Sequence, residues 1–426
     1  MSDRIAYVTA RFPPMQTSGT YRVEAVLQYL SSHGFELAPV TIPERWMTQQ
    51  SGGTLPPIAD RAVRQPESRL DPLVRRLASV PLIRRALREA LLPDILAIWA
   101  RSVGVRLVDS LRDVQLVYAT SPPFSAMILA DRLATSLGVP CVQEIRDPPS
   151  FNRRLRGRSK TWARRMLRFE GRYLTAADAV IAVTEGTRSR LLELHRNLDP
   201  ERCFVVTNGY PEIDADPSLS GRDPDSFTVT YVGSFQGGTK GREDSFFNPA
   251  TLLPALSSLP PDSVQLRIVG PATEAQRHMI SSAPGGDRVE FVGVVDRRHA
   301  IAEVAATDVA LILAEDDEWW IGRKVFESLA FAPRVLALVP TEGDTSRLLR
   351  AQEKAIIVGH NEVDRLEEIL AGLYSEWASA TQAATSREPE IGVQTDRSCV
   401  EQIAEVLRFI LQRSSGQSES LDRPGG

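Results

Sequence analysis

Two charged residues, one helical turn apart, mark the stretch of this sequence with the clearest chemistry. Lys324 and Glu327 follow an apolar run at 309–313, which has the length and composition of a buried strand. The residues that recur at helical spacing around them are apolar: Val325, Phe326, Leu329 and Ala330. In a parallel α/β sheet, a strand followed by a helix start places side chains at the carboxyl edge, where ligands bind. A lysine beside a helix start suits a phosphate, and a glutamate one turn further can accept hydrogen bonds from sugar hydroxyls.

A second basic group follows the strand expected at 227–234. Residues 235–242 read Phe-Gln-Gly-Gly-Thr-Lys-Gly-Arg, and Ser234 opens this loop. Backbone amides of a glycine-rich loop, together with Lys240 and Arg242, suit a pyrophosphate. The same pattern also fits a flexible basic loop without a ligand.

Further candidate contacts lie where other strands are expected to end. Gly343, Asp344 and Thr345 precede a helix expected through residue 350, and their amides could face a diphosphate, although ordinary capping gives the same pattern. In the first half, Gly19 stands before a helix, where a phosphate can approach the backbone closely, or where the chain simply turns. The candidates for an acceptor are Ser121, Arg146 and Asp147. Asp147 can hold a hydroxyl and Arg146 a carboxylate or phosphate, or the two can cap and support the following helix.

The elements that position these residues alternate between strand and helix twice along the chain. This alternation predicts an α/β protein built from two nucleotide-binding domains with parallel sheets. We expect an N-terminal domain at 1–209, which ends in a strand and Asn208-Gly209, and a Pro- and Asp-rich linker at 210–226. The second domain is expected at 227–390, followed by a helix at 391–413 that can pack back on the first domain. A Ser-, Gly- and Gln-rich tail at 414–426 is expected to be disordered.

Composition is that of a globular protein with an uneven distribution of charge. Of the 426 residues, 42% are hydrophobic and 24% charged. Residues 1–200 hold 29 Lys or Arg against 19 Asp or Glu, whereas the rest of the chain is acidic. The basic half can be a solvated surface or can contact an anionic membrane peripherally; no nucleic-acid partner is indicated. The three cysteines form no metal or disulfide pattern, and neither a signal peptide nor an apolar membrane span is evident, so we expect a cytoplasmic protein.

The order of these motifs resembles the retaining GT-B glycosyltransferases of the family-4 type. The helix motif matches at Lys324, Phe326, Glu327, Leu329, Ala330, Val335, Leu336 and Ala337. The first half adds Ser121-Pro122-Pro123, Gly138-Val139-Pro140 and Arg146-Asp147-Pro148. Three positions depart from the family pattern: Trp319 stands where many members have a first glutamate, Ala332-Pro333-Arg334 replaces Gly-Arg-Pro, and Pro149 replaces a tryptophan.

The resemblance implies two Rossmann-like, doubly wound domains that face a central cleft. It also implies a hexosyltransferase-type enzyme that moves a sugar, with retention, from a nucleotide-diphosphate sugar to a hydroxyl of a glycan, lipid-linked or small-molecule acceptor. No metal or other cofactor is implied. Lys240, Arg242 and Lys324 would stabilise the leaving diphosphate, and Glu327 would hold the ribose. The other donor contacts would be Gly19, Ser234, Gly343, Asp344 and Thr345. Bacterial relatives commonly build cell-surface polysaccharides or other glycoconjugates, or decorate secondary metabolites.

Two alternatives share this architecture. A sugar-nucleotide 2-epimerase would need histidine and acidic groups in the cleft, and the five histidines are scattered along the chain. A non-catalytic GT-B partner protein is the second alternative, because the acidic run Asp316-Asp317-Glu318 beside Trp319 would repel a diphosphate.

Overall fold

The chain divides into two compact units. The computed structural model describes residues 2–15, 18–43, 46, 62–64, 70–102, 104–151, 159–235, 248–313, 319–359, 361–379 and 392–421. Unit 1 comprises Met1–Thr207 and Asp396–Gly426, and unit 2 comprises Asn208–Thr395. Unit 2 therefore interrupts the sequence of unit 1, and the chain crosses between the units twice.

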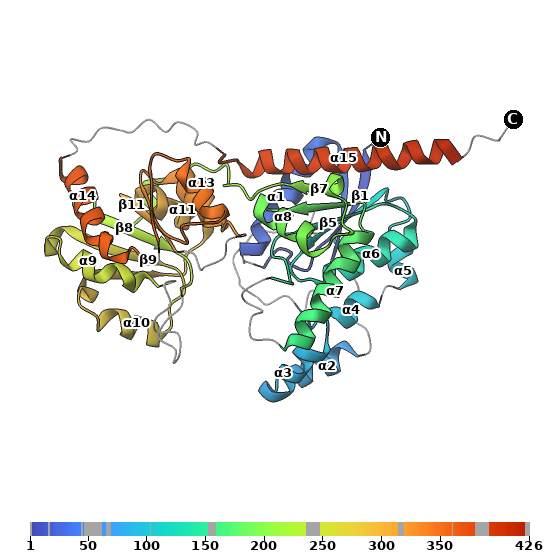
Figure 1. The fold of residues 1–426 in the computed structure, drawn as a ribbon, viewed down its shortest axis with the longest axis horizontal. Helices are drawn as coiled ribbons and strands as arrows, with labels where there is room; N and C mark the ends of the chain where they lie inside the picture. The colour runs from blue at the N-terminus through green and yellow to red at the C-terminus, as the bar shows by residue number, and fades with distance from the viewer. Residues whose placement is uncertain are drawn as a thin grey trace. The chain divides into compact units, whose positions relative to one another are not determined.

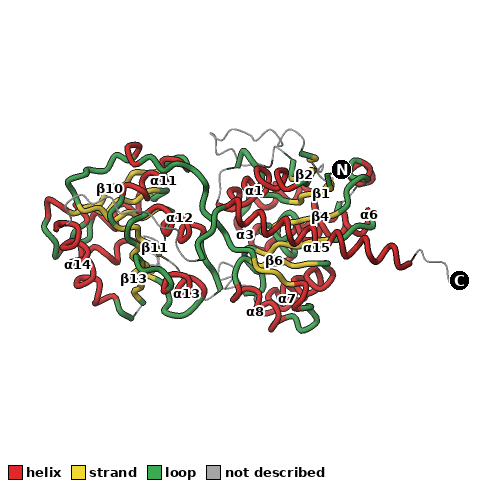
Figure 2. Tube along the Cα trace, turned by 90° about the horizontal axis from the view of Figure 1, so that it is seen from above, coloured by secondary structure: helices red, strands yellow, loops and turns green. Residues whose placement is uncertain are grey.

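Unit 1 is built on a seven-stranded parallel sheet in the order β3-β2-β1-β4-β5-β6-β7. Its strands are β1 (Asp3–Val8), β2 (Phe35–Thr41), β3 (Val63–Arg64), β4 (Leu116–Ser121), β5 (Cys141–Ile145), β6 (Ala179–Ala182) and β7 (Cys203–Val205). The strand order reverses between β1 and β4, which is the switch point of a doubly wound sheet. Figure 2 shows β2, β1, β4 and β6 following one another across this unit in yellow.

Helices cover both faces of this sheet. They are α1 (Ser18–Tyr29), α2 (Asp71–Ala78), α3 (Pro81–Ala90), α4 (Ala97–Arg101), α5 (Val105–Asp109), α6 (Ser125–Leu137), α7 (Lys160–Ala176), α8 (Glu185–Leu194) and α15 (Asp396–Leu421). Neighbouring side chains on a strand point to opposite faces. Gln143 donates a hydrogen bond to the carbonyl of Met127 in α6, whereas Glu144 accepts one from Arg22 in α1. The helices α1 and α6 therefore lie on opposite faces.

The last helix, α15, completes the core of unit 1 (Figure 1). Its buried residues recur at helical spacing, namely Cys399, Val400, Ile403, Ala404, Val406, Leu407 and Ile410. Arg408 donates a hydrogen bond to the carbonyl of His33 at 2.7 Å. The helix continues to Leu421, eight residues beyond the end at 413 that its polar composition predicts. Ser, Gln and Glu tolerate a helix that is already nucleated by packing, and the weak preference for disorder at 414–421 is overridden.

Unit 2 contains a six-stranded parallel sheet in the order β10-β9-β8-β11-β12-β13. Its strands are β8 (Phe227–Val232), β9 (Val264–Val269), β10 (Val289–Gly293), β11 (Val309–Leu313), β12 (Val335–Leu338) and β13 (Ala355–Val358). The helices are α9 (Leu253–Ser257), α10 (Glu274–Ser281), α11 (Arg297–Ala306), α12 (Arg323–Phe331), α13 (Asp344–Arg350) and α14 (Leu366–Ser379). Alternate residues of β11 enter two apolar clusters: Leu311 and Leu313 pack with α9 and α14, and Ala310 and Ile312 with α11 and α12. Both units are thus doubly wound α/β sheets, which confirms the predicted fold class.

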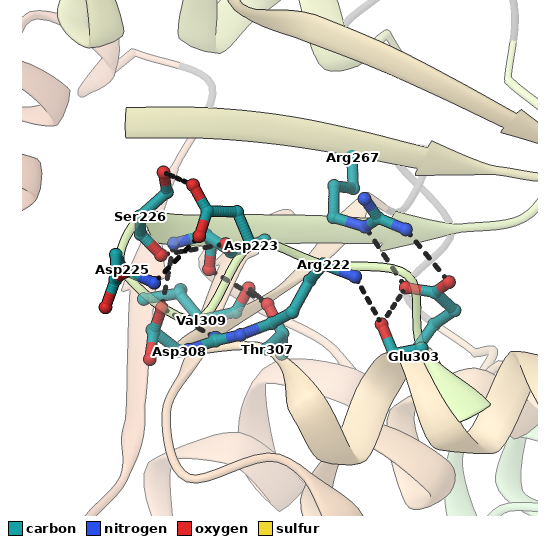
Figure 3. A network of polar contacts seen from close by, with 11 residues as sticks. Arg222, Asp223, Asp225, Ser226, Arg267, Glu303, Thr307, Asp308 and Val309 are labelled. Carbon is teal, nitrogen blue, oxygen red and sulfur yellow. Dashed lines mark hydrogen bonds and ion pairs between the residues drawn. The ribbon is translucent and has the colours of Figure 1, made fainter. Parts of the chain in front are cut away.

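The stretch that sequence composition marks as a linker, 210–226, belongs to unit 2. Arg222 donates a hydrogen bond to Asp308 at 2.8 Å, and the hydroxyl of Ser220 donates to Glu303 at 2.8 Å. Glu303 in turn receives two hydrogen bonds, of 3.1 and 3.0 Å, from the buried Arg267 of β9. Figure 3 shows Arg222, Arg267, Glu303 and Asp308 of this network as sticks. Its charged groups compensate one another, and together they fix residues 220–226 to the amino edge of the sheet.

Candidate functional site

Unit 2 brings two strand ends together where its strand order reverses. β8 pairs with β9 on one side and with β11 on the other. In open parallel sheets, this switch point leaves a crevice for ligands outside the carboxyl ends of the strands. The connection after β8 begins at Gly233, and the connection after β11 leads into α12 with Lys324 in its first turn. The predicted phosphate-binding lysine therefore stands at this edge of the sheet.

Lys324 lies directly over the backbone of Gly233. A Cβ atom added at Gly233 would fall 1.5 Å from the Nζ atom of Lys324, so the ammonium group occupies space that only a glycine leaves open. The φ angle of Gly233 is 146°, a conformation that other residues rarely adopt. The Nζ atom also lies 5.5 Å from the ring centre of Tyr231, and the hydroxyl of Tyr231 donates a 2.7 Å hydrogen bond to the carbonyl of Ser234. The loop after β8 and the start of α12 thus meet at one positive charge.

We predict that Gly233→Ala weakens the binding of a nucleoside diphosphate by roughly ten- to a hundredfold. The added methyl group displaces Lys324 and strains the backbone, and a hydrogen bond to a charged group contributes about 1.5–3 kcal/mol. Isothermal titration calorimetry measures the change. Gly372→Ala in α14 is the matched control, since a Cβ atom there meets nothing within 4 Å. Equal affinities for wild type and Gly233→Ala would show that Lys324 does not contact the ligand.

Glu327, one turn after Lys324, is held by two arginines. The Nε atom of Arg323 donates a hydrogen bond to its Oε1 atom at 3.1 Å, and the Nη2 atom of Arg297 lies 3.7 Å from the same oxygen. The side chains of Arg323 and Glu327 are only 7% and 14% exposed. Arg297 is the first residue of α11, which follows β10, so it reaches Glu327 from the same edge of the sheet. The two cations compensate the carboxylate and fix its position.

The start of α13 is tied to the loop before α12. Gly343 caps the helix with a φ angle of 123°, which favours glycine. The hydroxyl of Thr345 donates a hydrogen bond to the carbonyl of Trp320, and Asp344 accepts one from Arg347. Both predicted donor-binding side chains are therefore engaged within the protein, and the groups left to a ligand at this turn belong to the backbone.

Two predicted parts of this site lie outside the described residues. These are the loop with Lys240 and Arg242, at 236–247, and the acidic residues Asp316, Asp317 and Glu318. Ser234, the last exposed residue before that loop, is described and lies beside Gly233.

In unit 1, Arg146 connects the other predicted residues. Its guanidinium donates hydrogen bonds to the carbonyls of Gly19 at 2.7 Å, Pro122 at 3.3 Å and Ser121 at 3.4 Å. The hydroxyl of the buried Ser121 donates to the carbonyl of Glu144 at 3.1 Å. The structure brings Gly19, Ser121 and Arg146 together, and it uses both polar side chains to join loops. This geometry gives Arg146 a positioning role.

Asp147 differs from Arg146 in the hydrogen bonding of its side chain. It follows β5 at the carboxyl edge and is half-buried, and its carboxylate has no hydrogen bond or ion pair with any residue that the structure describes. Asp147 is therefore the predicted unit 1 residue whose side chain has the most freedom to accept a hydrogen bond from a ligand.

Sequence reasoning misses the buried ion pair between Arg22 and Glu144. The Nη2 and Nε atoms of Arg22 lie 2.8 and 3.0 Å from Glu144, whose side chain is fully buried. Arg22 also donates to the carbonyls of Val206 and Thr207, the last residues before the chain leaves unit 1. Burial opposes ionisation of Glu144, but the charges of Arg22 and then Arg146 outweigh it and hold its pKa below the usual value. The available signal was a single glutamate in the otherwise uncharged strand Cys-Val-Gln-Glu-Ile.

The described residues also include three of the five histidines, His195, His278 and His299, whose surroundings or elements can be compared. Within the described residues, no group of three His, Cys, Asp or Glu is placed to hold a metal ion. His195 of unit 1 lies 2.7 Å from the buried Glu170, whereas His278 and His299 belong to α10 and α11 of unit 2. None of the helices in the described ranges has both the length and the apolar composition needed to cross a membrane.

Comparison with known proteins agrees with this geometry. Residues 19–209 match the family described as "Glycosyl transferase 4-like domain". No curated protein matches the chain in sequence. Among solved structures, the sucrose-phosphate synthase of Thermosynechococcus elongatus is similar over 98% of this chain and 99% of its own, with a TM-score of 0.58 at 15% identity.

Two further structures widen the comparison. HepE of Anabaena, in complex with UDP and glucose, is similar over 99% of this chain and 100% of its own, with a TM-score of 0.55 at 16% identity. A putative UDP-N-acetylglucosamine 2-epimerase from Listeria monocytogenes covers 97% of this chain and 98% of its own, with a TM-score of 0.55 at 11% identity. The fold is therefore shared by transferases and by epimerases. Residues 19–209 thus match a glycosyl transferase 4-like domain, and the chain has the GT-B fold, as its motifs predict.

Proposed function

We propose that this protein is a retaining glycosyltransferase of the hexosyltransferase type, which uses a nucleotide-diphosphate sugar as its donor. The observation that supports the proposal best is the position of Lys324. Its ammonium group stands over Gly233 at the switch point of unit 2, one helical turn from the carboxylate of Glu327. At this separation, the cation can bind a diphosphate and the carboxylate can accept hydrogen bonds from the hydroxyls of the ribose.

In this proposal, unit 2 binds the donor and neutralises the leaving group. Lys324 faces the diphosphate, and negative charge that builds on its oxygens as the glycosidic bond breaks is stabilised by this preorganised cation. Lys240 and Arg242 are proposed to act in the same way. Arg323 and Arg297 hold Glu327 toward the ribose. The backbone at Ser234, Gly343, Asp344 and Thr345 completes the donor site of unit 2, and Gly19 is proposed as a further donor contact.

The acceptor is assigned to unit 1. Asp147 is proposed to accept a hydrogen bond from the acceptor hydroxyl, and Arg146 and Ser121 to position the loop that carries it. The nucleotide sugar is a co-substrate, and the cations that meet it are side chains of the chain itself. We therefore propose that transfer continues in the presence of EDTA. The biological setting proposed is the synthesis of a cell-surface polysaccharide or another glycoconjugate.

Thermal unfolding with nucleoside diphosphates tests the donor site. UDP is the first to try, since it is bound in HepE, followed by GDP, ADP and dTDP. A ligand at a hundred times its dissociation constant stabilises the folded state by about 2.7 kcal/mol. We expect one of these diphosphates to raise the unfolding temperature, and Lys324→Ala and Glu327→Ala to abolish the shift. Lys354→Ala, at the opposite edge of the same sheet, is the matched control and should keep it.

Mass spectrometry of the products separates the alternatives. A glycosyltransferase gives nucleoside diphosphate together with free or transferred sugar from its preferred donor. Conversion of a UDP-sugar into its 2-epimer would instead assign the protein to the epimerases that share its fold. No response to any nucleotide, by shift or by product, would support the non-catalytic partner protein and refute our proposal.

A further inference from the structure

The helices α2 and α3 expose a row of large apolar side chains. Leu70, Leu73, Leu77, Val80 and Ile83 have exposed fractions of 57%, 54%, 36%, 44% and 36%. These five make up half of the ten large apolar side chains with the highest exposure in the described part of the chain. The first four recur every three or four positions, so they follow one side of α2 as far as the start of α3. Contiguous exposed apolar surface of this kind marks an interaction site.

The same two helices are rich in arginine. Their sequences, Asp-Pro-Leu-Val-Arg-Arg-Leu-Ala and Pro-Leu-Ile-Arg-Arg-Ala-Leu-Arg-Glu-Ala, hold five arginines against two acidic residues. Asp71 is buried, and Glu89 accepts a hydrogen bond from Ser159 at 2.9 Å, so neither carboxylate projects freely from this surface. Arg76 and Arg84, by contrast, are exposed. The helices that carry the apolar row therefore also carry exposed positive charge at Arg76 and Arg84.

The helices α2 and α3 lie at one end of unit 1, which we call the tip. Figure 1 shows α2 and α3 in blue at the end of α7, on the side of unit 1 away from α15. The Nη1 and Nη2 atoms of Arg165 in α7 donate hydrogen bonds to the carbonyls of Glu89 and Ala90, at 3.3 and 3.4 Å. Lys160 and Arg164 are exposed in the first turns of α7, close to this junction. The tip thus presents two short helices, anchored at one end, with apolar and cationic groups on the outside.

The proline positions permit this arrangement. Pro72 and Pro81 stand in the first turns of α2 and α3, where a missing backbone N–H leaves no hydrogen bond unmade. They start two helices rather than break one. Each helix keeps its amphipathic pattern.

We propose that the exposed surface of α2 and α3 docks onto an anionic lipid bilayer. Leu70, Leu73, Leu77, Val80 and Ile83 enter the boundary between headgroups and acyl chains, and Arg76 and Arg84 meet the lipid phosphates. Interfacial helices with leucine on one face and arginine beside it bind bilayers by this combination of apolar burial and charge. Positive charge near an anionic leaflet strengthens the contact. This inference goes beyond the proposed transferase activity and does not depend on it.

A bilayer fits these observations better than a folded protein partner. The apolar residues form a row on helices at one end of unit 1, and the exposed Arg76 and Arg84 add positive charge on the same helices, which is the combination that binds an anionic bilayer surface. A lipid bilayer can bind these two helices without a groove that is complementary to them. A second copy of the chain or another protein is the competing occupant, and the experiment below distinguishes it.

Co-sedimentation of the full-length protein with vesicles tests the proposal. One vesicle type consists of phosphatidylcholine alone, and the other contains about one third phosphatidylglycerol. We expect the protein to bind the anionic vesicles, and raised salt to weaken the binding. Leu73→Glu combined with Leu77→Glu should reduce the bound fraction at least about tenfold, because two carboxylates replace buried apolar groups. Arg76→Ala combined with Arg84→Ala should weaken binding by a similar factor, through loss of attraction to lipid phosphates.

Matched variants show whether the effect belongs to this surface. Val105→Glu on α5 and Val294→Glu in unit 2 change side chains that are 76% and 77% exposed, and both should bind vesicles as wild type does. Arg196→Ala combined with Arg298→Ala removes two exposed arginines elsewhere and should also leave binding nearly unchanged. Far-ultraviolet circular dichroism and the urea midpoint verify that each variant folds.

Three results would overturn the inference. The first is a wild-type protein that stays in the supernatant with anionic vesicles. The second is equal loss of binding in the control variants, which would indicate diffuse charge rather than a docking surface. The third is a change in the sedimentation coefficient of Leu73→Glu/Leu77→Glu without lipid, which would identify the row as a contact between copies of the chain. None of the three readouts depends on sugar transfer, so failure of this inference can be distinguished from failure of the proposed function.

Discussion

Replacing Lys324 with alanine is expected to lower the turnover number for sugar transfer by about 10²–10³-fold. Loss of one preorganised group that faces developing negative charge typically costs about 2.7–4 kcal/mol of transition-state stabilisation. The Michaelis constant for the donor should change less than the turnover number, because charge on the diphosphate grows as the glycosidic bond breaks. Steady-state kinetics with the preferred donor measure both quantities, with release of the nucleoside diphosphate as the readout.

Two variants define the contribution of Lys324. Lys354→Ala removes a lysine from the amino edge of the same sheet and should retain wild-type turnover. Lys324→Arg keeps the charge, but the bulkier guanidinium must fit over Gly233 and should recover only part of the rate. A turnover number for Lys324→Ala within about twofold of wild type would exclude Lys324 from the catalytic step.

Arg22→Met is expected to destabilise unit 1 by about 3–5 kcal/mol, the typical effect of leaving one partner of a buried ion pair uncompensated. Glu144 loses its two hydrogen bonds from Arg22 but stays fully buried, and the carbonyls of Val206 and Thr207 lose a donor. Hydrogen exchange of β4 and β5 in increasing urea reports on unit 1 without a contribution from unit 2. The double variant Arg22→Met/Glu144→Met should regain much of the loss, since apolar pairs often replace buried ion pairs at little cost.

The dependence of this effect on pH follows from the lowered pKa of Glu144. Burial acts to raise that pKa, and the charges of Arg22 and Arg146 act more strongly to lower it. Stability from the pair is therefore complete above the ordinary glutamate pKa, about 4.3, and is lost as the pH falls through the lowered value. In Arg22→Met the difference from wild type should shrink as the pH falls from neutral to below about 4. Arg190→Met, which breaks an exposed pair with Glu193, should cost no more than about 1 kcal/mol at any pH. A constant difference across the pH range would contradict this account.

Much of the fold could be read from local patterns. The strand β11 has the bounds, 309–313, that its apolar run predicts, because a strand buried on both faces leaves a continuous apolar run in the sequence. The two-residue strand β3, Val63–Arg64, could not be predicted in this way, since two residues carry no periodicity. Composition marks 210–226 as a linker and does not indicate that these residues belong to unit 2. They are held there by the ion pair between Arg222 and Asp308, 86 positions apart, and by the hydrogen bond from Ser220 to Glu303, 83 positions apart, and no local pattern reveals such partners.

In the candidate site, too, some features could be predicted from the sequence and others only the structure reveals. The spacing of Lys324 and Glu327 identified one turn of one helix, and the structure places that turn at the strand-order switch. The importance of Gly233 depends on the neighbouring lysine being folded over it, so only the structure reveals it. For Arg146, sequence predicted the neighbourhood and a ligand role, but the three backbone carbonyls that its guanidinium contacts belong to residues up to 127 positions away. Geometry of this kind is set by tertiary packing and leaves no signature in spacing.

The place of α15 in the core of unit 1 has a consequence for how the protein is made. Residues 1–207 leave the ribosome first, but the apolar face formed by α1 and its neighbours has no cover until Cys399–Ile410 are synthesised. All of unit 2 is translated in between. Unit 1 therefore cannot complete its core until the 188 intervening residues, Asn208–Thr395, have been synthesised. A chain truncated before α15 would contain all of unit 2 but an incomplete unit 1.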